Sequence, residues 1–462
     1  MGKDWKRERT MNIVIIGDGK VGHKVARQLS EENYDVVLVD QNEQRVKLSS
    51  NELDIACIVG NGASAEVQRQ AGVPEADLVI ACASTDELNM FCCLLAKRLG
   101  AKRTMARVRS PLYFQQVHLI KEDLQLSMAV NPDQTLAEEI SRILFLPSAA
   151  KVETFAKGKV EMVQIILGPD NPLVDMSLVD FYKKHQIKML VCAVQREQQV
   201  FIPDGNFVLK AGDKIHVTAA HNEISRFFKT IGAWRNRVKT VMICGGGRSA
   251  YYLATRLHAM GMQVKIIEKD RERCLELCEL LPKATIIHGD ASDHSLLEEE
   301  GLATTDAFVS LTGIDEENII MSMYAKTRNV SKVITKVNDE GLREMVAQMG
   351  MESVVSAKNT AANVVLGYVR AMKNSMASAN VETMYQLLDD EVEALEFLIR
   401  EKTDYTGVAL KDLRTKEKHL IAAIVRKRQI IIPGGNDTLE VGDSVIVICK
   451  GRVLEDLEDI LA

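Results

Sequence analysis

Short apolar runs alternate with amphipathic stretches along the first third of the chain. The apolar runs lie near residues 12–16, 36–39, 55–59, 78–82, 104–108 and 126–130, and the stretches with helical spacing begin near residues 21, 42, 64, 86 and 112. The runs are apolar at consecutive positions, which is typical of strands covered on both faces. This alternation predicts an α/β fold with a doubly wound parallel sheet.

The pattern changes after a predicted helix at 134–145, which ends before Pro147. Alternating strands are predicted at 160–167, 189–194, 200–202 and 214–218, and Asp204-Gly205-Asn206 provides a turn between two of them. These segments predict a small α+β domain behind the parallel sheet. Its exposed apolar strands favour dimerisation, with binding of a second effector as the alternative.

The whole plan occurs twice. Gly17 and Gly245 follow matching strands at an offset of 228 (245 − 17), and Asp40 and Glu268 keep the same offset (268 − 40). The turn at 202–206 recurs at 432–436, an offset of 230 (432 − 202). So small a drift indicates a tandem duplication. The predicted units are an extension at 1–10, Rossmann-like sheet domains at 11–147 and 238–374, and small domains at 148–233 and 378–462.

The first copy carries a GxGxxG loop between a strand and a helix. The loop reads Gly17-Asp18-Gly19-Lys20-Val21-Gly22, and Asp40 follows Gly22 by 18 residues (40 − 22). In this fingerprint, Gly17 permits the tight turn, Gly19 admits a pyrophosphate and Gly22 lets the helix pack closely. The positive helix N-terminus then faces the phosphates. Asp40 would accept the ribose hydroxyls, which favours NAD(H) over NADP(H). The alternative is a loop that has lost its ligand.

The second copy repeats the loop with changes. It reads Gly245-Gly246-Gly247-Arg248-Ser249-Ala250, with Glu268 in the ribose position. Other candidate contacts follow the strand ends, where open sheets hold ligands: Asn61, Gly62, Ala83, Ser84 and Arg107, and in the second copy Asp290, Thr312 and Lys336. Arg107 and Lys336 end the fifth strands and would meet a phosphate, or else form surface salt bridges.

Charge and cysteine usage exclude several classes of protein. The net charge of −6 argues against a broad nucleic-acid footprint. The polar first ten residues are unlike a signal peptide, and no apolar run is long enough to span a membrane. Nine scattered cysteines without a CxxC pair predict a reducing, cytoplasmic setting.

Catalytic machinery is not evident. A hydride-transfer enzyme needs an acid or base set against the nicotinamide, and the nine histidines form no such arrangement. His288 and His294 flank an acidic loop but have no counterparts in the first copy, so we interpret them as loop residues and predict no metal site. Two alternatives to a binding protein remain: a soluble NAD-dependent oxidoreductase, and a redox sensor that acts on another partner.

From residue 11 onward the chain resembles the TrkA family of Trk-type potassium uptake systems, with RCK domains in tandem. The most specific matches are Gly17–Gly22 with Asp40, Ser84-Thr85-Asp86-Glu87, and Ala106-Arg107-Val108-Arg109. The resemblance implies a cytoplasmic, non-enzymatic regulatory subunit that binds NAD(H), with ATP and ADP as competing ligands. It also implies a dimer or tetramer that forms a ring beneath a membrane-embedded channel subunit. Arg248-Ser249-Ala250 departs from the family pattern, and occupancy of the second site stays open.

Overall fold

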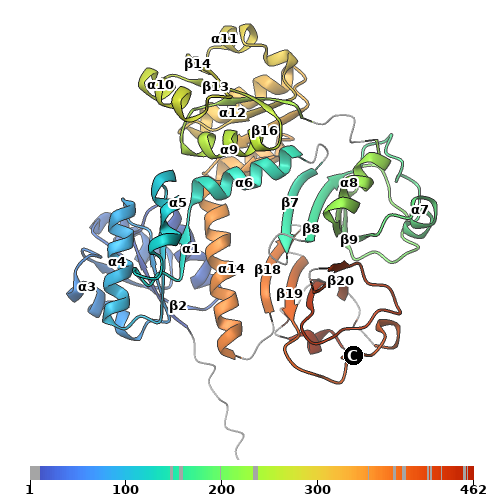
Figure 1. Ribbon diagram of the computed structural model, residues 1–462, viewed down its shortest axis with the longest axis horizontal. Helices are drawn as coiled ribbons and strands as arrows, with labels where there is room; N and C mark the ends of the chain where they lie inside the picture. Colours follow the sequence, from blue (N-terminus) through green and yellow to red (C-terminus); the bar gives the residue numbers. More distant parts are fainter. Residues whose placement is uncertain are drawn as a thin grey trace, which may run out of the picture.

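Two large and two small sheets make up the molecule (Figure 1). The computed structural model describes residues 11–145, 149–155, 160–197, 199–232, 238–351, 353–377, 381–387, 392–413, 416, 419–427, 429–450, 454 and 456–461. The predicted extension at 1–10 and the predicted boundaries at 147–148 and 233 lie outside these residues.

The first parallel sheet has the strand order β3-β2-β1-β4-β5-β6. Its elements are β1 (Asn12–Ile16), α1 (Lys20–Glu31), β2 (Asp35–Asp40), α2 (Glu43–Glu52), β3 (Ala56–Val59), α3 (Ala65–Gln70), β4 (Leu78–Ala81), α4 (Asp86–Leu99), β5 (Arg103–Arg107), α5 (Pro111–Ile120), β6 (Met128–Val130) and α6 (Pro132–Phe145). The order reverses between β1 and β4, which places a ligand crevice at the carboxyl ends of those strands.

The second parallel sheet repeats this order as β14-β13-β12-β15-β16-β17. Its elements are β12 (Thr240–Cys244), α9 (Arg248–Ala259), β13 (Gln263–Glu268), α10 (Arg271–Leu280), β14 (Thr285–His288), α11 (His294–Glu299), β15 (Ala307–Ser310), α12 (Asp315–Thr327), β16 (Lys332–Lys336), α13 (Glu340–Gln348), β17 (Val354–Val355) and α14 (Ala357–Ala377). The predicted fold class, two Rossmann-like parallel sheets in tandem, is confirmed.

Local sequence explains where several of these helices begin. Asn42 caps α2 by accepting a hydrogen bond from the Arg45 N–H, and Asp270 does the same for α10 through Arg273. Such caps satisfy backbone donors that a helix leaves unpaired. Between the helices the strands are buried, as in β4, where all four residues are inaccessible.

Each small domain is built on a five-stranded antiparallel sheet, with orders β10-β9-β11-β8-β7 and β18-β19-β22-β20-β21. The first comprises β7 (Ala149–Phe155), β8 (Val160–Ile166), α7 (Leu178–His185), β9 (Met189–Arg196), β10 (Gln199–Phe201), β11 (Lys214–Ala220) and α8 (His221–Thr230). The second comprises β18 (Val381–Leu387), β19 (Val392–Leu398), β20 (His419–Arg426), β21 (Gln429–Ile431) and β22 (Ser444–Lys450).

The two copies exchange their last sheet-domain helices. α6 leaves the first sheet and lies along α9 of the second, where Leu136, Ile140 and Leu144 enter the core that contains Leu253 (Figure 1). In the same way, α14 leaves the second sheet and packs its buried face on α1 of the first copy. Each parallel sheet is therefore covered on one face by a helix from the other copy.

The two small sheets also pack against each other. Cys192 and Ala193 of β9 share one apolar cluster with Ala422 and Ala423 of β20. The Lys450 Nζ of the second copy donates a hydrogen bond to the Val200 carbonyl of the first, at 2.9 Å. The apolar strands for which dimerisation was expected are thus covered within one chain, by the other copy.

Candidate functional site

Of the three glycines in the first glycine loop, one has open space beside its backbone. Gly17 has φ +107°, and a Cβ there would lie 2.7 Å from the backbone of Cys82 and Ala83. A Cβ on Gly22 would lie 2.0 Å from the Gly17 carbonyl oxygen, whereas one on Gly19 would meet nothing within 4 Å. Gly17 and Gly22 therefore shape the turn, and the backbone at Gly19 stands open to a bound group.

An acidic side chain holds each glycine loop in place. Asp40 Oδ2 accepts the Asp18 N–H at 2.6 Å, and Asp40 Oδ1 accepts the Asn42 N–H at 2.8 Å. In the second copy Glu268 Oε2 accepts the Gly246 N–H at 2.6 Å. A carboxylate oxygen accepts more than one hydrogen bond, so both groups can hold the loop and still receive a ribose hydroxyl.

Two asparagines that were not predicted as site residues connect neighbouring strand ends at the edge of the site. Asn89 Oδ1 accepts the Ala83 N–H at 2.6 Å, and its Nδ2 donates to the Arg107 carbonyl at 2.9 Å. Asn318 does the same between Thr312 and Lys336, at 2.9 and 3.0 Å. In the sequence both asparagines recur at the repeat offset and belong to segments that resemble the TrkA family, but neither observation indicates a place in the nucleotide site.

The cations at the ends of the fifth strands point inward. Arg107 Nη2 donates to the Ala83 carbonyl at 2.6 Å, and Lys336 Nζ donates to the Leu311 carbonyl at 3.2 Å. Burial lowers the pKa of both groups. Neither has a carboxylate partner within salt-bridge distance among the described residues, so the surface salt-bridge alternative is not what the fold shows.

The remaining first-copy candidates lie at the same edge of the sheet. Asn61 Oδ1 accepts the Ala63 N–H at 3.0 Å, which shapes the turn after β3. Gly62 packs so closely on Ile16 that a Cβ would lie 2.2 Å from its Cγ2. Ser84 follows β4 and is exposed. These residues, with Ala83, border the crevice from the side of β3 and β4.

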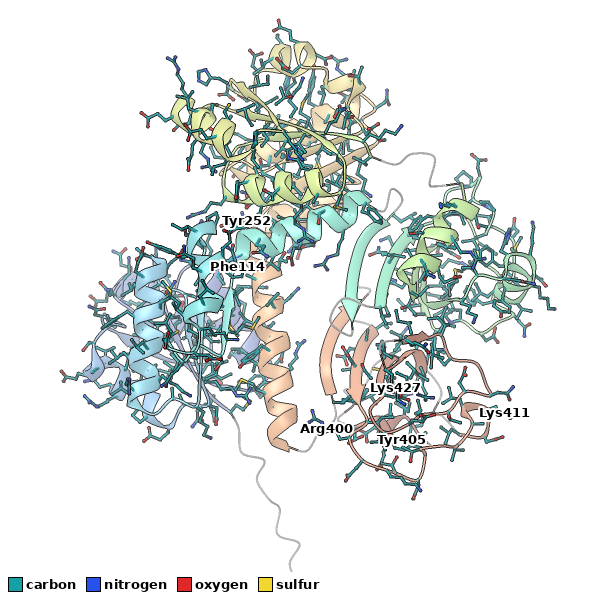
Figure 2. All side chains as sticks on the ribbon, viewed as in Figure 1. Phe114, Tyr252, Arg400, Tyr405, Lys411 and Lys427 are labelled. Atoms are coloured by element: carbon teal, nitrogen blue, oxygen red, sulfur yellow. The ribbon has the colours of Figure 1, made fainter. Side chains whose placement is uncertain are left out.

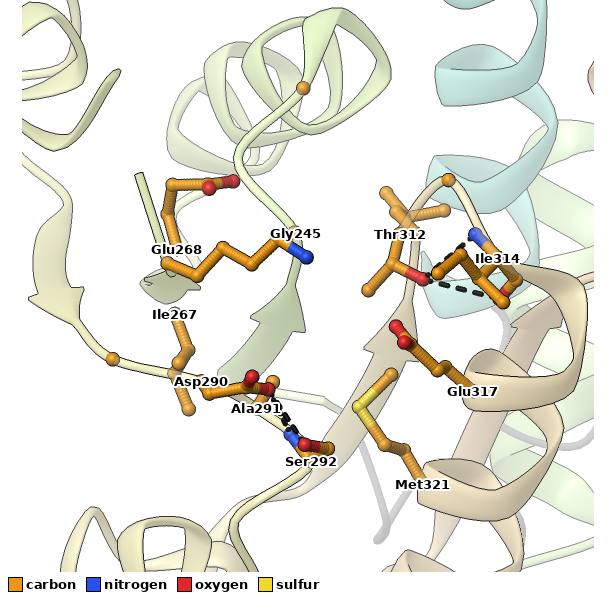
Figure 3. Close-up of a pocket in the computed structure, with 15 residues that line it drawn as sticks. Gly245, Ile267, Glu268, Asp290, Ala291, Ser292, Thr312, Ile314, Glu317 and Met321 are labelled. Carbon is orange, nitrogen blue, oxygen red and sulfur yellow. Dashed lines mark hydrogen bonds between the residues drawn. The ribbon is translucent and has the colours of Figure 1, made fainter. Parts of the chain in front are cut away.

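The second copy holds a defined cavity at the matching place (Figure 3). Its volume is about 330 Å³, and five of the predicted site residues line it: Gly245, Gly247, Glu268, Asp290 and Thr312. Hydrogen bonds from the Ser292 N–H and hydroxyl lower the pKa of Asp290. The apolar side chains of Ile267, Ile314 and Met321 complete the wall, and no sequence pattern had marked them.

Arg248 and Ser249 do not line this cavity. Ser249 Oγ donates to Asp133 Oδ1 of the first copy at 2.7 Å, and Arg248 Nε lies 3.6 Å from Asp133 Oδ2. The side chain of Asn131 donates to the Tyr252 hydroxyl beside them, at 2.8 Å. Figure 2 labels Tyr252, which lies on α9 where that helix meets α6. These two predicted site residues therefore face the other copy.

The histidines that flank the acidic loop have partners of other kinds. His288 Nε2 contacts the Lys269 carbonyl at 3.2 Å, and His294 stacks on Tyr324 with 3.8 Å between ring centroids. Within the described ranges, no cluster of three His, Cys, Asp or Glu residues has metal-binding geometry.

Comparison with known families accounts for most of the chain. The TrkA-N domain matches residues 13–132 and 241–357, and the TrkA-C domain matches residues 162–232 and 394–462. Each family domain thus occurs twice, in alternation, as the internal repeat predicts.

Relatives match over nearly the full length. The chain is 31% identical to the Trk system potassium uptake protein TrkA homolog 1 of Methanosarcina mazei, over 97% of this chain and 99% of the relative. It is equally identical to the Trk system potassium uptake protein TrkA of Halomonas elongata, over 97% of this chain and 98% of the relative. Both relatives are named for potassium uptake and not for an enzymatic reaction.

Solved structures share the fold. The GsuK channel bound to NAD superposes with a TM-score of 0.64 at 16% identity, covering 96% of this chain and 78% of that one. The GsuK RCK domain gives a TM-score of 0.63 at 16% identity, over 96% and 93% of the two chains. None of the helices that the structure describes in this chain is long and apolar enough to cross a bilayer.

Proposed function

Because the chain belongs to the TrkA family of potassium uptake proteins, we propose that it is the nucleotide-sensing regulatory subunit of a Trk-type potassium channel. It binds NAD(H), and ATP and ADP compete for the same crevices. It associates from the cytoplasmic side with a membrane-embedded channel subunit, as a homo-oligomer of two or four chains in a ring. It has no nucleic-acid partner and catalyses no reaction.

One observation carries the ligand assignment: each copy presents a glycine loop whose backbone is hydrogen-bonded to an acidic side chain, Asp40 or Glu268. This is the arrangement that dinucleotide-binding sheets use for ribose and pyrophosphate. The solved GsuK channel, whose fold this chain shares, is described as bound to NAD. On this proposal the nucleotide contacts in the first copy come from Gly17–Gly22, Asp40, Asn61, Gly62, Ala83, Ser84 and Arg107. In the second copy they come from the five predicted residues that line the cavity: Gly245, Gly247, Glu268, Asp290 and Thr312.

Regulation requires only that two conformations bind the nucleotide with different affinity. The exchanged helices offer a route, because α6 and α14 each belong to one copy and pack on the other. A nucleotide that changes the angle between α1 and its sheet therefore also acts on α14, and through it on the second copy.

Calorimetric titration with NADH, NAD⁺, ATP and ADP tests the assignment. Asp40→Ala and Glu268→Ala should each weaken one class of site by about tenfold, the effect of removing a charge-assisted hydrogen-bond acceptor. The matched control is Asp35→Ala, at the exposed opposite end of the same strand as Asp40. Absence of binding by all four nucleotides contradicts the proposal, and steady NADH oxidation would favour the oxidoreductase alternative.

Coupling to transport needs a second measurement. Potassium flux into vesicles that contain the channel subunit should depend on this chain and change when the nucleotide is exchanged. The Asp40→Ala, Glu268→Ala double variant should still associate with the channel but lose the nucleotide response.

A further inference from the structure

A polar network joins the first glycine loop to the two helices beside it. Asp18 of the loop is only 6% exposed, and its Oδ2 accepts a hydrogen bond from the Ser49 hydroxyl of α2 at 2.7 Å. His23 of α1 completes the network, because its Nδ1 lies 3.1 Å from Asp18 Oδ1 and 2.9 Å from Ser49 Oγ. Three polar side chains therefore connect the loop, α1 and α2.

The second copy has different residues at these three places. At the repeat offset of 228, the positions of Asp18, His23 and Ser49 are taken by Gly246, Tyr251 and Leu277. Leu277 is completely buried and packs so closely under the second loop that a Cβ on Gly246 would lie 2.5 Å from its Cδ1. A buried carboxylate is unfavourable unless hydrogen bonds satisfy it, so Asp18 depends on its partners in α1 and α2.

The two ring nitrogens of His23 face groups of different kinds. Nδ1 faces the Asp18 carboxylate and the oxygen of Ser49, whose own hydrogen is donated to Asp18, so Nδ1 carries a hydrogen. Nε2 lies 3.4 Å from Arg27 Nη2 and 3.5 Å from Glu52 Oε2. In the neutral ring Nε2 accepts from Arg27, whereas in the protonated ring it donates to Glu52.

His23 also borders the space in front of the glycine loop. His23 and Gly19 line one cavity of about 730 Å³, so a charge on the ring acts where the open backbone of Gly19 faces. The other charged side chains that line this cavity come from both copies: Lys20, Lys24, Arg27, Arg45, Glu52, Asp315, Asp339, Glu340 and Lys358. On the Asp18 side, burial and the Asp18 carboxylate raise the pKa of the Cys57 thiol of β3.

We propose that His23 is a positioning residue that makes nucleotide binding by the first copy sensitive to pH. The protonated ring adds a positive charge beside the open backbone of Gly19 and attracts the phosphates of the nucleotide more strongly than the neutral ring does. Because linkage is reciprocal, the bound nucleotide draws a proton onto the ring. This inference rests on the proposed function, since it concerns the nucleotide that the first glycine loop binds.

The change of partner at Nε2 extends to the second copy. Arg27 pairs with Glu52 at 3.1 Å and lies 3.7 Å from Glu340 of α13. A protonated His23 repels the guanidinium group and competes for Glu52, so Arg27 moves toward Glu340. Protonation in the first copy thereby tightens a contact with the second.

Calorimetric titration of the full chain with NAD⁺ tests the proposal at about pH 5.5 and about pH 7.5, on either side of the usual imidazole range. NAD⁺ is the suitable probe because it has no terminal phosphate, a group that itself titrates near pH 6. The parent chain carries Glu268→Ala, which weakens the second site. Its affinity should be about threefold higher at the lower pH, as expected for one added charge near the phosphates. Binding should also take up a fraction of a proton, measured from the heat in buffers of different ionisation enthalpy.

Three variants of this parent separate the ring's charge from its packing. His23→Gln keeps a polar side chain that does not titrate, so NAD⁺ affinity should be equal at both pH values, without proton uptake. Glu52→Gln removes the carboxylate that faces Nε2 and should move the midpoint of the affinity change to lower pH. The control is His294→Gln, at an exposed histidine of the second copy that stacks on Tyr324, and it should behave as the parent does.

Each result either supports the inference or overturns it. Affinity that still rises in acid as steeply in His23→Gln as in the parent would overturn it, because the proton would then bind elsewhere. If His23→Gln bound no NAD⁺ at either pH, Glu52→Gln would decide, and an unshifted midpoint would overturn the inference. Binding by the parent that is independent of pH contradicts this inference alone. A parent that binds no NAD⁺ at either pH contradicts the proposed function as well.

Discussion

At Gly22 the first glycine loop has no space for a methyl group, since a Cβ would lie 2.0 Å from the Gly17 carbonyl oxygen. The second copy carries Ala250 at the matching position, and that residue is completely buried. The two loops therefore differ in how closely helix and turn approach, although both follow the same pattern of glycines. An alanine that is native to one copy is a clash in the other.

Gly22→Ala should destabilise the first sheet domain by about 2 kcal/mol or more, because backbone must move to relieve the contact. It should also weaken the first-copy nucleotide site. Denaturant unfolding of the full chain measures the loss of stability. Gly19→Ala serves as the comparison for stability, since a Cβ there meets nothing within 4 Å; an equal loss in both variants would contradict this account.

In the first small domain, we expect the ion pair between Arg196 and Asp213 to be sensitive to acid. Arg196 Nε and Nη2 donate to the two oxygens of buried Asp213, each at 2.8 Å. Burial acts to raise the pKa of Asp213, but the hydrogen bonds from Arg196 and the Lys210 N–H outweigh it and lower the pKa. A lowered folded-state pKa stabilises the protein above the unfolded value of about 4, and this contribution is lost as the pH falls through the folded pKa.

The free energy of unfolding should therefore decline below about pH 4 in part because of Asp213. Asp213→Asn should lose about 3 kcal/mol at neutral pH, since it leaves Arg196 without its charged partner. It should also show a shallower decline with acid. Urea titrations between pH 3 and 7 compare the slopes, and a variant as steep as wild type would assign the acid sensitivity to other groups.

Among the elements, α6 shows where sequence reasoning succeeded and where it stopped. Its apolar spacing predicted a helix near 134–145, and the structure has Pro132–Phe145. The same spacing could not show which sheet Ile140 packs on, because a helical apolar face is equally suited to either copy. The predicted strand at 126–130 shortened to Met128–Val130 for a similar reason, since an apolar run does not mark where pairing begins.

The site divides in the same way. Glycine loops and their acidic residues were predictable because the spacing is fixed by backbone geometry. The contacts of Arg248 and Ser249 with Asp133 could not be predicted, because they form only when the two copies pack together. Ser249 and Asp133 are 116 residues apart in the sequence. Asn89 and Asn318 were missed since an asparagine on a helix carries no signal for the two strand ends that it joins.

Ile140→Ala should destabilise the second sheet domain, although Ile140 belongs to the first copy. Ile140 is completely buried in the cluster that contains Leu253, and removing such a side chain typically costs about 3 kcal/mol. Hydrogen exchange should speed up first in β12 and β13. Leu119→Ala, at a position that is 72% exposed on α5, should have almost no effect. Faster exchange confined to β1 and β2 would argue against the exchanged packing.

For the molecule as a whole, the two copies are joined by helices, sheets and ion pairs. Arg370 of α14 pairs with Glu32 after α1, and Lys24 of α1 pairs with Glu340 of α13. The antiparallel sheets of the two small domains also pack together and bury Ala423 between them. Three separate contacts thus hold one copy against the other along the length of the chain.

Ala423→Glu should separate the small sheets, because it places an unpaired charge in their apolar contact. The expected result is a larger radius of gyration in small-angle scattering and a loss of about 3 kcal/mol or more in stability. Val441→Glu, at a site that is 54% exposed, provides the matched change on the surface. An unchanged radius in the Ala423 variant would mean that α6 and α14 suffice to hold the copies together.

The exchanged helices also bear on how such a chain evolves. When two identical subunits pair, every mutation appears at both junctions at once, so a substitution that suits one and harms the other is removed by selection. Once the copies are fused into one gene, each junction carries its own mutations. The equivalent positions Val21 and Ser249 differ in this way, because Ser249 Oγ donates to Asp133 of the other copy and a valine has no hydroxyl to donate. Fusion thereby turns two equivalent sensors into two that can answer to different signals.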